Sequence, residues 1–570
     1  MKIGRLIRGP LLWRNLLGAL GLFCALQLQA ATQPEHIAIA TAHPAATVAG
    51  QETLALGGNA FDAAVAISAA LAVVEPYGSG LGGGGFFLLR EAGESPVYRF
   101  LDARERAPLA ADADLYKVDG KVDKKLSLDG ALAAAIPGLP AALVELAERF
   151  GRLPLRDSLA PAIRLARSGV SIDRVYRERV SWRIEAMRND AETARLFLEK
   201  GEIPEEFSLL RQPELALTLE QLAAEGHQGF YDGKVAETLV QAVQAAGGIW
   251  SLSDLAAYRI VERQPLRVQL DQGRELISAP PPSAGGIALG QSLLMLQQLP
   301  WRQADAVQRT HLVVETLRRA YRDRGLLGDP DFVSNPARQL LAPDYLKQLA
   351  SSIDPHHATP SDSLPPSNPW KEGDHTTHFS VLDTEGNAVA ATLSVNLPFG
   401  AAFTVPGTGV LLNNEMDDFA ADVQGANAYG LSGSQANSIA AGKRPLSSMS
   451  PSFIESSQDF ASFGTPGGSR IPSMVLLAML EYLDQQPIDR WPSVSRYHHQ
   501  YRPDLIEHEP DTFSAAQRSA LNALGHQLKS TGRQYGNQQV LFWDKQDGSV
   551  EAASDPRGIG TAIVKPDAPQ

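Results

Sequence analysis

The chain has 570 residues, of which 44% are hydrophobic and 20% are charged. That balance is typical of a folded globular protein and excludes a largely disordered chain. The formal net charge of -13 argues against a nucleic acid as partner, because nucleic-acid-binding proteins carry basic surfaces that neutralise phosphates. The length predicts several domains or one large multilayered domain.

Residues 1–30 have the pattern of a secretory signal peptide. Basic residues come first, at Lys2, Arg5, Arg8 and Arg14. An apolar core at 16–28 and the small-residue exit Leu28-Gln29-Ala30 follow, and this core is too short to span a membrane comfortably. We therefore expect a periplasmic or secreted protein without a stable membrane anchor, an uncleaved anchor being the alternative. The only cysteine, Cys24, lies in this segment, so the mature protein would depend on a large core rather than on disulfides.

The first half of the chain predicts helices around one early hairpin. Residues 47–74 are rich in alanine with apolar residues at helical spacing, broken at Gly57-Gly58, which predicts two packed helices. A glycine run at 78–85 precedes two short strands at 86–89 and 97–101, which predict a hairpin. Residues from about 134 to 350 are mainly helical, with a turn at 280–286. Residues 354–374 have no apolar period and predict a loop.

Several apparent motifs do not carry chemistry. Gly80 to Gly85 fits G-x-G-x-x-G, but a dinucleotide-binding motif needs a strand before it and a helix after it. Here a helix precedes the motif and a hairpin follows it. The sequence Gly430-Leu431-Ser432-Gly433-Ser434 lacks the last glycine of a serine nucleophile elbow. The pairs His356-His357 and His498-His499 have no recognised zinc spacing, so we interpret them as solvated loop histidines and expect no metal site.

Beyond the loop, a second hairpin is predicted to begin at Thr376. Its strands, at residues 378–382 and 388–395, flank a three-residue loop with Gly386 in the left-handed region. This register pairs Asp383 with Asn387 and places Thr376 opposite Ser394, close enough for a cross-strand hydrogen bond. A four-residue loop would break the pairing.

A threonine between a linker and a strand is where a self-cleaving precursor would place its nucleophile. After cleavage before it, Thr376 would carry both a hydroxyl and a free α-amine, which can act as nucleophile and base. The neighbouring Thr377 fits equally well. From the hairpin alone, the favoured interpretation is a plain hairpin with polar residues on its solvated face.

Six further motifs in the chain accompany Thr376-Thr377-His378-Phe379-Ser380-Val381, at residues 57–64, 78–85, 101–105, 411–419, 444–451 and 465–470. With them, the chain closely resembles the γ-glutamyltranspeptidase family of N-terminal nucleophile hydrolases. The resemblance implies an α+β fold, a four-layer αββα sandwich, and cleavage between His375 and Thr376. The products would be a large subunit of residues 31–375 and a small catalytic subunit of residues 376–570, joined as a heterodimer.

The resemblance also implies the catalytic groups. Thr376 would be the nucleophile for self-cleavage and turnover, with its α-amine as base, so no cofactor is needed. Ser394 stands where the family usually has threonine, and its hydroxyl would bond to the nucleophile. Backbone N–H groups of Gly467 and Gly468 would bind the oxyanion. Because a free α-amine titrates near about 7.7–8.0, we expect activity that rises on the alkaline side of neutral.

The implied substrates are glutathione and related γ-glutamyl compounds, with water, amino acids or peptides as acceptors. Arg104, assisted by Ser448, would bind the α-carboxylate, since a guanidinium pairs with a carboxylate in two-pronged fashion. The α-ammonium would be bound by Glu415 and Asp418. Hydrogen bonds would come from Asn396 and Ser447, and Tyr429 would be the gate of a lid loop.

Blander interpretations stand beside these roles. Alone, Arg104 is one surface arginine among several, Asp417-Asp418 is an acidic turn, and Ser447-Ser448 and Gly467-Gly468 are turn residues. Two alternative functions remain. One is a sister acylase acting on β-lactam side chains or poly-γ-glutamate, and the other is a non-catalytic secreted binding protein that retains the fold.

Overall fold

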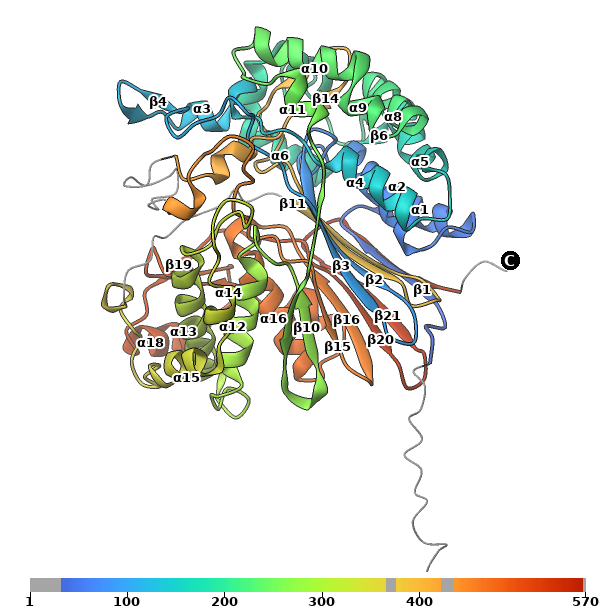
Figure 1. Cartoon of the computed structure of the whole chain (residues 1–570). Helices are drawn as coiled ribbons and strands as arrows, with labels where there is room; N and C mark the ends of the chain where they lie inside the picture. The colour runs from blue at the N-terminus through green and yellow to red at the C-terminus, as the bar shows by residue number, and fades with distance from the viewer. Residues whose placement is uncertain (1–31, 365–375, 422–433, 567–570) are drawn as a thin grey trace, which may run out of the picture.

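The computed structural model describes residues 32–364, 376–421 and 434–566 (Figure 1). Within these ranges, seven strands form one antiparallel sheet and six form a second. In spatial order, the first sheet holds β22 (Thr561–Lys565), β1 (Ile37–Thr41), β11 (Thr376–Leu382), β12 (Ala388–Ser394), β2 (Gly84–Glu91), β3 (Val97–Ala103) and β8 (Val261–Arg263). The second holds β21 (Val550–Ser554), β20 (Gln539–Asp544), β16 (Asp459–Gly464), β15 (Ser452–Glu455), β10 (Glu275–Ser278) and β9 (Leu266–Gln269).

The two sheets face each other, and helices cover their outer faces (Figure 1). On the first sheet lie α1 (Pro44–Ala55), α2 (Ala60–Val74) and α4 (Leu139–Arg149), backed by α5 (Leu155–Ser168) and α8 (Pro213–Glu225). On the second lie α12 (Gly285–Leu296) and α16 (Ile471–Leu483), backed by α13 (Ala306–Arg324) and α15 (Pro343–Ser351). The predicted mixture of helices and antiparallel strands is confirmed.

Smaller elements complete the described part of the chain. The helices are α3 (Lys125–Leu128), α6 (Arg174–Arg188), α7 (Ala191–Phe197), α9 (Gln228–Tyr231), α10 (Gly233–Ala245), α11 (Leu252–Ala256), α14 (Ala337–Leu340), α17 (Arg490–Ser493) and α18 (Ala515–Ala523). The short strands are β4 (Lys117–Val118), β5 (Lys121–Val122), β6 (Val170–Ser171), β7 (Leu209–Leu210), β13 (Thr404–Val405), β14 (Val410–Leu411), β17 (Tyr497–His498), β18 (Ile506–His508) and β19 (Leu528–Ser530). Among the helices described, none has the length and apolar character to cross a bilayer.

Strand alternation in β11 decides which side chains face the second sheet. Phe379 and Val381 pack into the core under the helices α1, α2 and α4. Leu382 packs into the core between the sheets, and the Ser380 hydroxyl lies 2.8 Å from that of Ser462 on β16. Even-numbered residues of β11 therefore point between the two sheets, and odd-numbered ones toward the helices.

The predicted hairpin at β11 and β12 is confirmed with its register. Asp383 donates its backbone N–H to the carbonyl of Asn387 at 3.0 Å, and Gly386 has a φ of 89°. A side-chain oxygen of Asp383 also accepts the backbone N–H of Ala60 at 3.0 Å. The turn is thus fastened to the start of α2, which places the opposite end of the hairpin, with Thr376, beyond the other end of that helix.

The early predictions also hold. The segment at 47–74 forms two helices, α1 and α2, as predicted. The strands predicted at 86–89 and 97–101 lie within β2 and β3. The glycine run enters strand β2 rather than a helix, which agrees with rejecting a dinucleotide site. The predicted signal peptide, residues 1–30, lies outside the described residues.

Candidate active site

Thr376 is the first residue of β11, and its hydroxyl is buried without a hydrogen-bond partner among the described residues. Ser394 lies directly opposite, as the register predicted. The expected hydrogen bond between these two hydroxyls is not formed, and the Ser394 hydroxyl accepts the backbone N–H of Asn396 at 2.8 Å. An unpaired buried hydroxyl is costly, and Thr376 also lines a cavity, so the two features together make Thr376 a candidate nucleophile.

Arg104 lies on the same row of the sheet as Thr376. Ser394 pairs with Gly84, and the register of β2 with β3 carries the row on to Arg104, one residue beyond β3. The side chains on this row point between the two sheets. Three strand spacings of about 4.8 Å separate the two backbone positions, roughly 14 Å in total. An arginine side chain and a small amino-acid substrate together can bridge that distance.

The Arg104 guanidinium is only 1% exposed, so it is not the surface arginine that its sequence neighbourhood suggested. One terminal nitrogen bonds to Glu415 and the other to Asp418. Burial raises the pKa of Glu415 well above its ordinary value, against the opposing effect of Arg104. Burial likewise raises the pKa of Glu105, 3.7 Å from Arg104, to about 7. This buried set of one cation and several carboxyls can exchange its internal pairs for the charged groups of an α-amino acid.

A network of asparagines holds the segment that carries Glu415. Asn413 donates through its side-chain amide to the carbonyls of Gly82 and Ala135, at 2.6 and 2.8 Å, and accepts the Glu415 backbone N–H at 2.9 Å. Asn396, in the left-handed region with a φ of 73°, donates to the carbonyl of Asn414 at 2.9 Å. The predicted substrate residue Asn396 is thus brought beside the Glu415 segment.

The neighbouring carboxylates of Asp417 and Asp418 bind different partners. The Asp418 carboxylate bonds to Arg104, whereas Asp417 accepts a hydrogen bond of 2.6 Å from the hydroxyl of Ser127 and lies outside the Arg104 cluster. The interpretation of an acidic turn therefore suits Asp417 and not Asp418.

The two serines, Ser447 and Ser448, are both buried but have different partners. The Ser447 hydroxyl accepts the backbone N–H of Met449 at 3.1 Å. The Ser448 hydroxyl accepts hydrogen bonds from Arg324, from Nε at 3.2 Å and Nη2 at 3.0 Å. Arg104 stays close to this segment, because it donates to the carbonyls of Pro445 and Leu446 at 3.3 and 3.4 Å. Arg324 was missed from the sequence, since α13 carries five arginines and nothing in their spacing distinguishes it.

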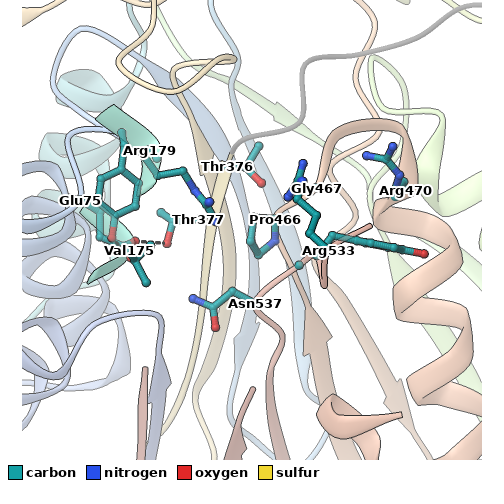
Figure 2. Close-up of a pocket in the computed structure, with 14 residues that line it drawn as sticks. Glu75, Val175, Arg179, Thr376, Thr377, Pro466, Gly467, Arg470, Arg533 and Asn537 are labelled. Carbon is teal, nitrogen blue, oxygen red and sulfur yellow. Dashed lines mark hydrogen bonds between the residues drawn. The ribbon is translucent and has the colours of Figure 1, made fainter. Parts of the chain in front are cut away.

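Gly467 and Gly468 form the turn between β16 and the start of α16, with φ values of 138° and 55°. A Cβ on Gly464, the last residue of β16, would lie 2.1 Å from the His378 ring, so β16 packs directly on β11 at this end. Gly467 and Thr376 line the same cavity (Figure 2). The glycine turn thus lies near Thr376 at a helix start, where N–H groups favour negative charge.

Glu75 is a second residue that sequence reasoning missed. It follows α2, lines the cavity with Thr376 and is buried (Figure 2). Its carboxyl accepts hydrogen bonds from the hydroxyls of Thr377, at 2.7 Å, and Tyr77, at 3.1 Å. Burial raises the pKa of Glu75 to about 7. Thr377 is therefore committed to Glu75 on the helix side of β11, and this distinguishes it from Thr376.

The prediction of solvated histidines was half wrong. His356 and His357 are exposed, but His498 and His499 are buried. His498 Nδ1 lies 2.6 Å from the Ser473 hydroxyl, and His499 Nε2 lies 3.2 Å from Asp504. Burial lowers the pKa of His498 to about 3 and of His499 to about 4, so both are neutral members of a hydrogen-bonded core.

One buried group in the described part of the chain has the residue types of a metal site: His311, Glu315 and His526. His311 Nδ1 and His526 Nε2 are 2.8 Å apart, the length of a hydrogen bond between them. Glu315 is paired with Arg318 and Arg319. These contacts are those of a structural network.

The predicted cleavage residue His375 and the predicted lid residue Tyr429 lie outside the described residues.

Comparison with known proteins places the chain in a family. A family model described as gamma-glutamyltranspeptidase matches residues 46–565. The glutathione hydrolase proenzyme of Pseudomonas sp. (strain A14) is 38% identical, over 90% of this chain and 90% of that protein. The glutathione hydrolase proenzyme of Escherichia coli (strain K12) is 37% identical, over 91% of this chain and 90% of that protein.

Solved structures similar to this chain include a member of the same family and an acylase. The gamma-glutamyltranspeptidase of Helicobacter pylori is 37% identical and covers 57% of this chain and 93% of its own, with a TM-score of 0.55. A cephalosporin acylase from Bacillus halodurans is 26% identical and covers 94% of this chain and 96% of its own, with a TM-score of 0.83.

Proposed function

Because the chain belongs to the gamma-glutamyltranspeptidase family and is a γ-glutamyl hydrolase and transferase, we propose that Thr376 carries its chemistry as an N-terminal nucleophile. One observation supports this most strongly. The unpartnered hydroxyl of Thr376 lies on the row of the sheet that leads to the buried cluster of Arg104, Glu415 and Asp418.

The proposed reaction begins with cleavage of the peptide bond between His375 and Thr376, which frees the α-amine of Thr376. In turnover, that amine accepts the hydroxyl proton while Oγ attacks the γ-carbonyl of glutathione or a related γ-glutamyl amide. The carbonyl oxygen becomes an oxyanion, for which the backbone N–H groups of Gly467 and Gly468 are the proposed donors. The amine leaves with a proton, and a γ-glutamyl ester remains on Thr376. Water, an amino acid or a peptide then resolves the ester, and no cofactor takes part.

The substrate's charged ends would replace pairs that the protein makes with itself. The α-carboxylate would bind Arg104, assisted by Ser448, and the α-ammonium would bind Glu415 and Asp418. Asn396 and Ser447 would add hydrogen bonds, and Tyr429 would close over the pocket. Since Arg104 already pairs with Glu415 and Asp418, the zwitterion exchanges one set of buried ion pairs for another and leaves no charge unpaired.

The fold supports a heterodimer that stays together after cleavage. We propose a four-layer αββα sandwich built jointly by residues 31–375 and 376–570. In the first sheet, β1 from the former segment lies between β11 and β22 from the latter, and in the second, β10 pairs with β15. Separating the subunits would break both sheets. Residues 1–30 would direct export to the periplasm or outside the cell.

An acylase of the cephalosporin type is the second candidate, because the Bacillus halodurans acylase shares the fold over nearly the whole chain. The buried ion cluster around Arg104 favours a zwitterionic γ-glutamyl group instead. Assays of glutathione beside glutaryl and adipyl β-lactams would separate the two. Hydrolysis of the β-lactam side chains alone would favour the acylase.

The direct test compares the purified wild type with Thr376→Ala on a denaturing gel, with intact mass and N-terminal sequencing. We expect two fragments in the wild type, one beginning at Thr376, and one chain in the variant. We also expect the wild type alone to release glutamate from glutathione. A wild type that remains one chain and only binds glutamate would favour the non-catalytic binding protein.

A further inference from the structure

The cavity beside Thr376 lies on the opposite side of β11 from Arg104. Arg104 is reached from Thr376 through β12, β2 and β3. The cavity wall at residues 533–537 adjoins Gly558, because a Cβ on that glycine would lie 2.5 Å from the side-chain oxygen of Asn537. Gly558 shortly precedes β22, on the β1 side of β11. A substrate whose γ-glutamyl half extends toward Arg104 would therefore direct its other half toward this cavity.

Two arginines from distant parts of the sequence meet at the cavity. Figure 2 shows Arg179 of α6 and Arg533 approaching it from different walls. Both guanidinium groups lie against the ring of Trp182, at 4.2 and 4.5 Å from its centroid. An indole face can hold a guanidinium in a fixed plane while its N–H groups remain available. The two cations are thus gathered at one place.

Neither arginine is fully paired within the described residues. The Arg533 guanidinium has no hydrogen bond or ion pair to any residue described in the structure, only its contact with Trp182. Nη1 of Arg179 lies 3.3 Å from a carboxylate oxygen of Glu178, an ion pair without a hydrogen bond, and this nitrogen has no hydrogen-bond partner in the described ranges. By contrast, Arg470, which also lines the cavity, is bound by Glu507 at 2.8 Å. Two neighbouring cations with spare donors favour an anionic ligand between them.

The remaining acidic group in the cavity, Glu75, attracts Arg179 through its charge but makes no hydrogen bond or ion pair with either arginine. Glu75 has both carboxyl oxygens engaged, one by the Thr377 hydroxyl and the other by that of Tyr77. The Glu75 carboxyl binds Thr377 on β11, the strand that carries Thr376. The guanidinium groups of Arg179 and Arg533 therefore keep N–H donors that can bind a ligand.

We propose that Arg179 and Arg533 form a subsite for the carboxylate of the amine that leaves Thr376, and of the acceptor that replaces it. This inference rests on the proposed function. In glutathione the leaving amine belongs to a dipeptide with a carboxylate at its far end. Two extended residues span about 7 Å, a length that suits a bridge from the Thr376 hydroxyl to a wall of the same cavity. The guanidinium groups would bind the carboxylate through charge-assisted hydrogen bonds.

The test measures whether these arginines recognise the charge of the leaving group. Arg533→Gln and Arg179→Gln are compared with wild type on glutathione and on γ-glutamyl-p-nitroanilide, whose leaving group has no carboxylate. The transfer reaction is measured with glycylglycine and with glycylglycinamide. Arg533→Lys retains the charge, and Arg156→Gln, whose side chain is 74% exposed on α5, is the matched surface control.

We expect each glutamine variant to raise KM for glutathione and glycylglycine at least about tenfold more than for their uncharged counterparts. Arg533→Lys should recover part of the loss, and Arg156→Gln should behave as wild type. Equal losses on charged and uncharged compounds, or no loss on either, would overturn the subsite. If the wild type failed to process itself or to cleave either donor, the proposed function itself would fail, which is a distinguishable result. Gel analysis of each variant confirms that cleavage occurred before kinetics are compared.

Discussion

The Ser448 hydroxyl accepts two hydrogen bonds from Arg324, a residue 124 positions earlier in the chain. The arginine comes from the last turn of α13 and is buried. Because these two donors occupy both lone pairs of the Ser448 oxygen, the hydroxyl proton is directed away from Arg324. We infer that Arg324 orients Ser448, the serine that we propose contacts the substrate carboxylate.

A double-mutant cycle tests this coupling. We expect Arg324→Gln and Ser448→Ala each to raise KM for glutathione several-fold with a smaller change in kcat, and the double variant to be no worse than the worse single one. Arg322→Gln on the same helix is the control, because Arg322 bonds to Asp323 and Tyr345 instead. Its effect should simply add to that of Ser448→Ala. Additivity for both arginines would show that Arg324 acts only through the stability of α13.

Arg104→Lys tests whether two-pronged geometry matters beyond charge. The lysine keeps one positive charge among Glu415 and Asp418 but cannot bond to both carboxylates in the same plane. We expect kcat/KM for glutathione to fall about 100-fold. In the matched variant Arg106→Lys, the neighbouring half-buried arginine loses its hydrogen bonds to the carbonyls of Gly442 and Ala257, and kcat/KM should change less than about threefold. Similar losses in the two variants would contradict the special role of Arg104.

Gly467→Ala tests the proposed oxyanion turn. A Cβ there would lie 2.5 Å from Cε of Met474, in a backbone with a φ of 138°. We expect the displaced turn to lower kcat about 100-fold. The control is Gly201→Ala, where φ is 81° and no atom lies within 4 Å of the added carbon. That variant should lose about 1 kcal/mol of unfolding free energy and keep its kcat. Comparable kcat values in the two variants would remove the turn from the reaction.

Glu75 makes folding depend on pH. Its carboxyl has a pKa of about 7 in the fold against an ordinary value of 4.5, so between these values the folded chain binds more protons than the unfolded one. The unfolding free energy therefore falls as pH rises through this window and levels off above about pH 7. In Glu75→Gln, we expect the decrease in unfolding free energy between pH 5 and pH 8 to be smaller than in the parent by about 3 kcal/mol.

The measurement is urea unfolding in a Thr376→Ala background, so that all samples remain single chains. Glu94→Gln, at an exposed loop position, is the control. If Glu75→Gln and Glu94→Gln shared the same pH dependence as the parent, burial of Glu75 would not govern this window.

Local patterns were sufficient for much of the fold. The three-residue loop with Gly386 set the hairpin register, since changing loop length would shift every pair, and that register placed Ser394 opposite Thr376. The break at Gly57-Gly58 separated α1 from α2 for an equally local reason. The motifs around Arg104, Glu415 and Asp418 indicated the family, although nothing in their spacing showed that they touch.

The burial of individual side chains and their contacts with distant segments could not be predicted from the sequence. His498 and His499 resemble loop residues along the chain, but neighbouring segments exclude water from them and leave them neutral. Likewise, the expected hydrogen bond between Thr376 and Ser394 is not formed, and the Ser394 hydroxyl accepts the backbone N–H of Asn396 instead.

The amino-acid sequence by itself determined the register of the hairpin formed by β11 and β12, the break between α1 and α2, and the set of residue types available for an amino-acid substrate, because these depend on near neighbours in the chain. Only the tertiary structure decided which of those residues share one buried site. The stacking of two sheets set Gly467 beside Thr376, the packing of α13 supplied Arg324 to Ser448, and the approach of α6 brought Arg179 to Arg533. The physical reason is that desolvation and ion pairing depend on atoms that meet in space from segments far apart in the sequence.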